Sequence, residues 1–194
     1  MDYLISTDEN NIGKLTIVDE NDNSFLLCEE ETPFSYSTVT IGNQTWTSVS
    51  IDYNVESDYQ YSTDIQIVND VNLAPITFYK INALETLEHI HDEYRLPTID
   101  DIEELKSFVN NNSISLKSTF GWNTNQGTNI YGFNAKPHGC FARIGSTISW
   151  LNVGSSYLFW LKNSKICNIS DNNTISYSNA DTLWMYNVRL IKNR

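Results

Sequence analysis

The feature that most constrains this chain is a proline corner that leads directly into a strongly patterned helix. Arg95-Leu96-Pro97-Thr98 is followed by residues 99–109, in which apolar side chains recur at helical spacing. Thr98 is a good N-cap because its hydroxyl can accept a hydrogen bond from a free amide of the first turn. Pro97 disfavours helical backbone at the residue before it. The sequence therefore predicts a helix over residues 98–110 that begins immediately after a sharp corner.

A second apolar stripe precedes this corner. Leu84, Leu87 and Ile90 are spaced three residues apart, which predicts another short helix over residues 82–92. After residue 110 the helical pattern stops, and short apolar pieces alternate with turns rich in Asn, Gly and Ser. That pattern is typical of a β region with many loops. We expect a strand near residues 184–192 to close this region.

The first part of the chain reads as strands separated by polar turns. Residues 14–31 predict a β-hairpin, and residues 38–51 predict two further strands joined by a tight turn at Gly42-Asn43. Residues 52–72 are polar and acidic and predict a surface loop. We therefore divide the chain into an acidic β-hairpin arm, residues 1–37, and a main domain, residues 38–194.

Charge is distributed unevenly along the 194 residues. Residues 1–104 hold 22 Asp and Glu against 3 Lys and Arg, a net charge of −19, whereas residues 105–194 hold 2 against 9, a net charge of +7. The halves are therefore expected to present different surfaces. A net charge of −12 disfavours nucleic acid as a partner. No apolar run is long enough for a membrane span, and the acidic N-terminus does not read as a signal peptide.

Five short motifs occur in a fixed order along the chain. They are Val39-Thr-Ile-Gly-Asn-Gln-Thr-Trp46, Arg95-Leu-Pro-Thr98, Tyr131-Gly-Phe-Asn-Ala-Lys-Pro-His-Gly139, Phe159-Trp160 and Val188-Arg-Leu-Ile191. Their order and spacing resemble the Fibrobacter succinogenes major paralogous domain family over about residues 38–192. In place of the family's usual Cys-Pro-x-Gly-Trp, this chain has His91-Asp-Glu-Tyr94. The resemblance implies an α+β, C-type lectin-like fold: two helices packed on a twisted, loop-rich antiparallel sheet.

Residues that could carry chemistry are few. Cys28, Cys140 and Cys167 are odd in number and widely spaced, which predicts neither a disulfide framework nor a zinc site. Cys140 lies two residues from His138, but closeness in sequence alone does not make a catalytic dyad. The calcium motifs of sugar-binding C-type lectins are absent, and residues 105–194 offer only two carboxylates. We therefore predict no catalytic residue, no metal and no cofactor.

The second half is instead rich in Asn, Ser, Tyr and Trp, a composition that suits a recognition surface. We expect ligand contacts in its polar loops and on a few aromatic anchors, of which Tyr177 should carry much of the binding energy. The acidic residues 52–72 are the competing contact surface. The predicted contact residues are Asn123, Asn125, Tyr157, Lys162, Asn172, Asn173, Tyr177, Asn179 and Trp184.

The resemblance implies a non-catalytic binding module, because the family is linked to surface adhesion and is similar to receptor-binding proteins of phages. We expect a virion component, in a tail or head fibre, that recognises a host-surface glycan or protein. One alternative is a structural assembly protein that docks on neighbouring subunits, or on copies of itself, through residues 1–37. Another is an enzyme similar to formylglycine-generating enzymes. A cytoplasmic location is the alternative to the virion.

Overall fold

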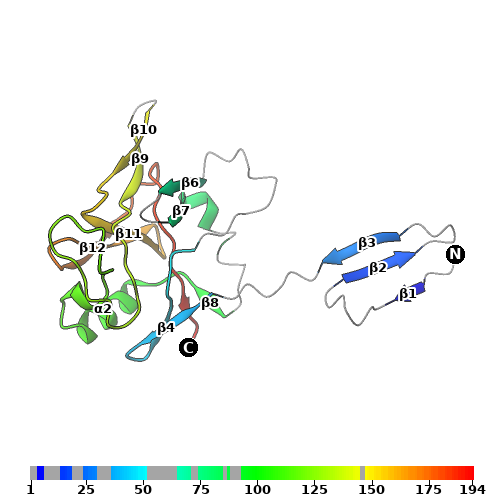
Figure 1. Ribbon diagram of the computed structural model, residues 1–194, viewed down its shortest axis with the longest axis horizontal. Coiled ribbons are helices and arrows are strands. Elements are labelled where there is room, and N and C mark those ends of the chain that lie inside the picture. Colours follow the sequence, from blue (N-terminus) through cyan, green and yellow to red (C-terminus); the bar gives the residue numbers. More distant parts are fainter. Residues whose placement is uncertain are drawn as a thin grey trace. The chain divides into compact units, whose positions relative to one another are not determined.

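The computed structural model divides the chain into two compact units, residues 1–35 and 36–194. It describes residues 4–6, 14–18, 24–29, 36–51, 65–70, 74–84, 87, 93–144 and 147–194. Figure 1 shows the elements of each unit. The boundary between these units lies two residues before the one expected from the sequence, residue 37.

The first unit contains a three-stranded antiparallel sheet in the order β1-β2-β3. β2 (Lys14–Val18) and β3 (Ser24–Glu29) form the hairpin expected for residues 14–31, with a bulge between Leu15 and Thr16. β1 (Leu4–Ser6), which is not expected from the sequence, pairs with the other side of β2. The arm therefore has a strand on each side of β2.

The second unit is built from several small antiparallel sheets and one α-helix, α2 (Ile99–Phe108), among the residues that the structure describes. Two 3-10 helices, Ile81–Ala83 and Ser113–Ser115, complete its helical part. A four-stranded sheet has the order β4-β5-β14-β8, a three-stranded sheet has the order β11-β12-β13, and β6-β7 and β9-β10 form two hairpins. The strands are β4 (Thr38–Ile41), β5 (Gln44–Thr47), β6 (Ile65–Asp70), β7 (Ala74–Tyr79), β8 (Tyr94–Arg95), β9 (Cys140–Ile144), β10 (Thr147–Leu151), β11 (Ser156–Leu161), β12 (Lys165–Ser170), β13 (Ile175–Asn179) and β14 (Ile191–Lys192).

The predicted fold class, two helices packed on one twisted sheet, is wrong. The β structure is divided among separate small sheets, and α2 is the one α-helix whose bounds the structure describes. Asparagines in the left-handed region, such as Asn152 and Asn163, follow strands of five and six residues and keep the strands short. Of the expected helix at 82–92, Leu84 and Leu87 are helical and buried, and residues 85, 86 and 88–92 lie outside the described residues.

The acidic stretch 52–72, expected to be a surface loop, is in part a strand. Residues 65–70 form β6 and pair with β7 over six residue pairs. Residues 52–64 and 71–73 lie outside the described part of the chain. The alternation Ile65-Gln66-Ile67-Val68 is a strand pattern that the high polarity of its neighbours obscured.

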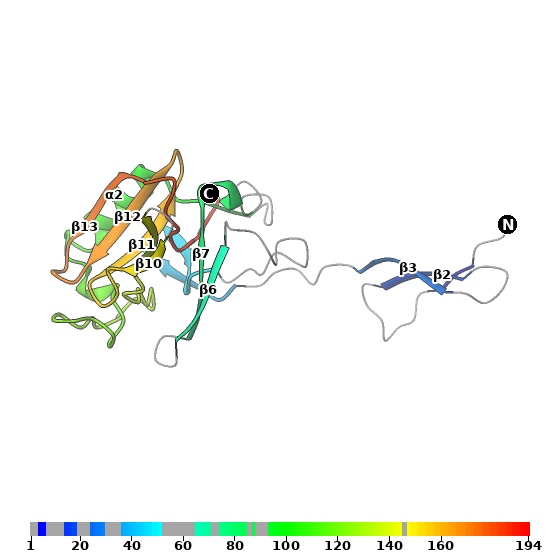
Figure 2. The same cartoon turned by 90° about the horizontal axis from the view of Figure 1, so that it is seen from above.

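Two hydrophobic clusters lie on opposite faces of the β11-β12-β13 sheet. On one face, α2 contributes Ile102 and Leu105, which pack with Phe159 and Cys167. In two perpendicular views α2 runs alongside this sheet (Figures 1 and 2). On the other face, Leu158 and Trp160 pack with residues from the segments around them, among them Tyr79, Leu96, Tyr186 and Leu190.

The C-terminal segment 185–192 connects most of these sheets. Isolated bridges join Met185 to β9, Tyr186 to β7 and Asn187 to β11, and Ile191 then pairs with both β5 and β8. Between them, Arg189 is buried and donates hydrogen bonds to the carbonyl oxygens of Thr47 and Phe133 at 2.8 and 2.6 Å. The strand expected near 184–192 is thus a short strand preceded by a segment of single bridges.

The corner before α2 is held by a buried carboxylate. Thr98 is the N-cap, as the sequence predicts, and its side chain forms a capping box with Asp101. Arg95 donates two hydrogen bonds to the Asp101 carboxylate, at 2.6 and 2.9 Å. Burial alone would raise the pKa of Asp101, but the hydrogen bonds from Arg95 and Thr98 and the charge of Arg95 hold it below its ordinary value.

Deleting residues 1–35 should leave the second unit folded, because the hydrophobic clusters of the described residues lie wholly within residues 36–194. We expect the thermal unfolding temperature, followed by circular dichroism, to change by no more than a few degrees. Deleting residues 1–47 should prevent folding, since it also removes Trp46, which is buried in the first cluster. An unfolded 36–194 fragment would contradict this division.

Asp101→Asn should lower the free energy of unfolding by about 2 kcal/mol at pH 7, because it removes the helix cap and the partner of Arg95. Since the folded pKa of Asp101 is lowered, the wild-type advantage should be fully present above about pH 4 and disappear as the pH falls through the folded value. Urea unfolding from pH 2 to 7 measures this dependence. Asp100→Asn, at the exposed neighbouring position, should have little effect; an equal loss would contradict a special role for Asp101.

Candidate functional site

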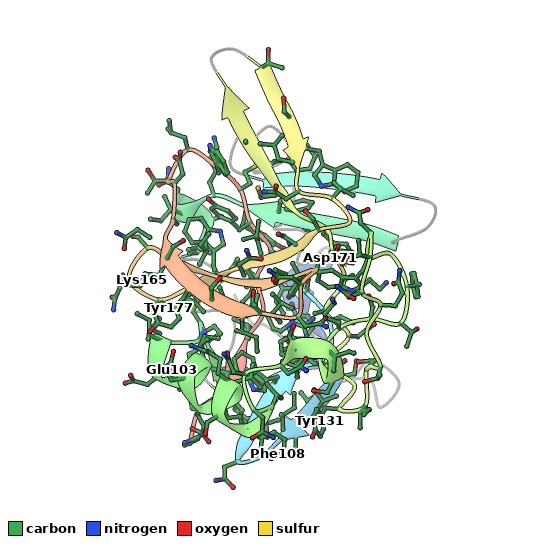
Figure 3. The ribbon with its side chains drawn as sticks, turned by 90° about the vertical axis from the view of Figure 1, so that its left-hand side faces the viewer. Glu103, Phe108, Tyr131, Lys165, Asp171 and Tyr177 are labelled. Carbon is green, nitrogen blue, oxygen red and sulfur yellow. The ribbon has the colours of Figure 1, made fainter. Side chains whose placement is uncertain are left out.

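Three loops meet at one end of the β11-β12-β13 sheet, and together we call them the loop cluster: residues 120–126, 152–155 and 171–174. Backbone hydrogen bonds join the first loop to the second, from Asn123 to Gly154 at 2.8 Å, and the third to the second, from Asp171 to Ser155 at 2.8 Å. Figure 3 shows Asp171 at this end of the sheet. The site is therefore built from three separate segments, the first and third of which are joined by contacts between residues 46 and 47 positions apart in sequence.

The Asp171 carboxylate fastens the first loop to the third. It accepts hydrogen bonds from the Thr124 hydroxyl at 2.7 Å and from the backbone amides of Thr124 and Asn125 at 3.1 and 3.0 Å. Partial burial opposes ionisation, but these hydrogen bonds and the positive charge of Lys117 together lower the pKa of Asp171 below its ordinary value. At neutral pH the carboxylate is charged and its acceptor positions are occupied by the loop.

Lys117 supports the loop cluster from beneath. Its side chain is 0% exposed, and its Nζ donates to the Asp171 carbonyl at 3.0 Å and to Asn173 Oδ1 at 2.8 Å. The same Nζ lies 4.2 Å from the centre of the buried Trp122 ring. Burial lowers the pKa of Lys117, while the charge of Asp171 acts in the opposite direction. The ammonium group thus joins the third loop, through Asp171 and Asn173, to Trp122 of the first loop.

The structure brings four of the predicted contact residues together in the loop cluster, and three of them stabilise the loops themselves. Asn125 donates from its side chain to the Asp171 carbonyl at 3.0 Å. Asn172 accepts at Oδ1 from the Thr174 hydroxyl at 2.8 Å, closing the turn between β12 and β13. Asn173 adopts φ 66°, a left-handed conformation that asparagine tolerates, and also accepts from Lys117. Their amides are therefore largely used within the protein.

Asn123 differs from these three because its exposed side chain lies over Gly154. A Cβ at Gly154 would come within 2.3 Å of Asn123 Oδ1, and Gly154 also has φ +78°. Glycine is therefore required here both for its backbone conformation and for the space it leaves. The Asn123 side chain therefore rests against the second loop and remains exposed.

Three other predicted residues lie on the same sheet away from the loop cluster, Lys162 and Asn179 at its opposite end and Tyr177 midway along β13. Lys162 is half-buried in the turn between β11 and β12, and Asn179 accepts a hydrogen bond from Lys165 at 2.8 Å. Tyr177 is 39% exposed, and its ring lies 5.4 Å from Lys106 Nζ of α2. Figure 3 shows Tyr177 between β13 and the helix. These residues form a second group, separate from the loop cluster.

The two remaining predicted contacts belong to the interior. Tyr157 is 0% exposed and its hydroxyl bonds Ser50 and Arg189 at 2.8 and 3.0 Å, so its proposed role as an aromatic anchor for a ligand is corrected to a core role. Trp184 is half-buried and packs on the edge of the second hydrophobic cluster, with its ring centre 6.4 Å from that of Tyr186. Tyr157 is thus held by neighbours far away in sequence, whereas the ring neighbour of Trp184 lies two residues away.

Sequence reasoning missed two exposed apolar residues of the loop cluster, Phe120 and Val153. Phe120 is 48% exposed, with Lys136 Nζ 5.8 Å from its ring centre. Trp122 is buried although it lies only two residues further on, because Gly121 at φ 93° reverses the chain between them. The Phe-Gly-Trp order was the available signal, since a glycine between two aromatics permits one to be buried and the other exposed.

Cys140 and His138, the pair considered for catalysis, are both buried. Burial raises the pKa of Cys140 to about 11, with the side-chain amide of Asn152 acting in the opposite direction. A thiol with such a pKa stays protonated at neutral pH and is a poor nucleophile. His138 is buried, with its Nδ1 3.4 Å from Asn187 Oδ1. Within the described ranges no cluster of three metal-ligating side chains occurs, and no helix has the length and apolar character needed to cross a membrane.

The chain was compared with known proteins in three ways. A scan against protein-family models, a search of curated proteins and a search of solved structures each found no match. The resemblance of the sequence motifs to the Fibrobacter succinogenes major paralogous domain family therefore stays a prediction.

Asp171→Asn should loosen the first loop of the cluster, because the charged acceptor of three hydrogen bonds is lost. We expect hydrogen exchange of the Thr124 and Asn125 amides to accelerate about tenfold. Asp181→Asn is the matched control, since Asp181 accepts one backbone hydrogen bond, from Leu183 at 2.9 Å, outside the loop cluster. Unchanged exchange at Thr124 in Asp171→Asn would show that the carboxylate does not hold the loop.

Proposed function

We propose that residues 36–194 form a non-catalytic binding module that recognises a polar surface, a glycan or a protein, through the loop cluster. The observation that carries this proposal is the internal bracing of the loops by Asp171 and Lys117, beside which Phe120 and Asn123 stay exposed. A recognition surface that is ordered before binding loses less conformational entropy on association. The hydrogen bonds of Asp171 and Lys117 order the loops in this way.

The chemistry of the loop cluster favours an uncharged polar ligand. Asp171 is its single ionisable side chain, and that carboxylate is already occupied by Thr124 and Asn125. Phe120 supplies a rigid apolar surface of low side-chain entropy, and Asn123 supplies both a donor and an acceptor. The pair therefore suits a ligand with adjacent apolar and hydrogen-bonding faces, such as a sugar ring or a neutral peptide loop.

In its narrower form the proposal is that the ligand lies on a host surface and that the protein is part of a virion. The resemblance of the sequence motifs to the Fibrobacter succinogenes major paralogous domain family supports this form. Adsorption to bacterial cells then measures the same interaction as binding to an isolated ligand. A glycan array and a panel of outer-surface proteins separate the two ligand classes.

The test compares two double variants that each remove one exposed apolar and one exposed polar side chain. Phe120→Ala with Asn123→Ala should weaken adsorption or array binding by about tenfold or more, since a central aromatic contact typically accounts for about 2 kcal/mol. Thr182→Ala with Leu183→Ala, outside the loop cluster, is the matched control and should bind as the wild type does; both of its side chains are exposed.

Asn172→Ala should have a smaller effect than the Phe120 and Asn123 variant, because its Oδ1 acts within the turn. Circular dichroism on every variant shows whether the fold is retained. Binding that is unchanged in the loop-cluster variant but lost when the acidic residues of 52–72 are replaced would overturn this placement. Turnover of the ligand on the array would overturn the non-catalytic part.

A further inference from the structure

β13 is an open edge of the β11-β12-β13 sheet. Among the described residues no other strand pairs with it. The ladder to β12 is framed by backbone bonds from Ser170 to Thr174 at 3.0 Å and from Ala180 to Ser164 at 2.9 Å. In an antiparallel ladder the bonded residues alternate, so Ser176 and Ser178 face β12, and Ile175, Tyr177 and Asn179 direct their backbone groups away from it.

α2 flanks this edge, because its Lys106 side chain reaches Tyr177 of β13. The Tyr177 ring lies between the helix and the strand, with Lys106 Nζ 5.4 Å from the ring centre (Figure 3). At the C-terminal end of β13 a hollow of about 240 Å³ opens between the start of α2 and the turn from β11 to β12. Its lining residues are Thr98, Ile99, Asp100, Lys162, Asn163 and Lys165.

The charged side chains near the outer edge of β13 indicate which kind of segment could pair with it. Lys162 and Lys165 line the hollow at the C-terminal end of β13, and Asp100 is the one carboxylate among its described lining residues. Midway along, Lys106 and Glu103 form an ion pair at 2.7 Å and largely cancel. A second copy paired antiparallel about Tyr177 would place the neutral start of its own β13 opposite the two lysines. An acidic segment would gain charge pairs there that a second copy does not offer.

We propose that the outer edge of β13, flanked by α2, binds an extended segment of a partner protein as a fourth strand, with acidic residues of that segment meeting Lys162 and Lys165. Main-chain hydrogen bonds to Ile175, Tyr177 and Asn179 supply the affinity, and the two lysines select the charge and direction of the segment. This surface is separate from the loop cluster, at the other end of the same sheet, so both can be occupied together.

The experiment uses the full chain and three fluorescein-labelled peptides in anisotropy titrations. The probe is Glu-Val-Asp-Val-Thr-Val-Thr, whose acidic N-terminal end reaches the lysines when it pairs antiparallel with β13. The second peptide replaces both acids by lysine, and the third carries N-methyl groups on alternate residues, which remove its strand hydrogen bonds and keep its charge. We expect the acidic probe to bind about tenfold tighter than its lysine form and the N-methylated form not to bind.

Variants of the protein locate the site. Asn179→Pro removes an outward amide and should abolish binding of the acidic probe, whereas Asn179→Ala removes only the side chain and should retain affinity within about twofold. Lys162→Gln with Lys165→Gln should weaken binding about three- to tenfold, as expected for two partly exposed charge pairs. If Asn179→Pro does not fold, as judged by circular dichroism, the N-methylated peptide still tests strand addition.

Each other outcome overturns the proposal. Equal binding of the acidic and lysine peptides would remove the role of Lys162 and Lys165, and undiminished binding of the N-methylated peptide would exclude strand addition. Self-association of the full chain that Asn179→Pro abolishes, without binding of the acidic probe, would show that the edge pairs with a second copy. None of these results bears on the loop cluster, whose variants are Phe120→Ala and Asn123→Ala.

Discussion

The guanidinium group of Arg189 is the interaction on which the second unit most depends. It is 1% exposed, donates to backbone or hydroxyl oxygens of Thr47, Phe133 and Tyr157, and lies 4.0 Å from the centre of the Phe133 ring. A buried charge is costly unless its donors are satisfied, so these segments must stay together for the arginine to remain inside. The position of Arg189 in the C-terminal segment lets the last residues of the chain hold several sheets in place.

The β11-β12-β13 sheet separates two surfaces of different chemistry. At the turn between β12 and β13, the loop cluster is neutral apart from an occupied carboxylate and presents Phe120 and Asn123. At the other end, Lys162 and Lys165 lie beside the start of α2. Both faces of the sheet between these two ends are buried, with Phe159 packed in one hydrophobic cluster and Trp160 in the other. A rigid sheet with distinct ends is a suitable frame for binding two partners.

The asparagine-rich composition has a structural meaning that composition alone does not reveal. Asparagine was expected to make adaptable contacts, yet seven asparagines occupy the left-handed region among the described residues. Asn173 was predicted as a contact and serves a turn, while Asn123 retains an exposed side chain. The side chain alone does not distinguish the two uses, because both depend on the backbone conformation that distant segments impose.

Local sequence determined the elements whose partners lie within a few residues. Thr98 and Asp101 cap α2 across one turn, and the hairpin of β2 and β3 closes over a short connection, so both could be predicted. Only the tertiary structure decided which aromatics are buried and how the strands divide into sheets. Tyr157 is enclosed by Ser50 and Arg189, 107 and 32 residues away, and no pattern around it encodes their approach. Long-range packing overrides local preference there, which is why one predicted sheet became several.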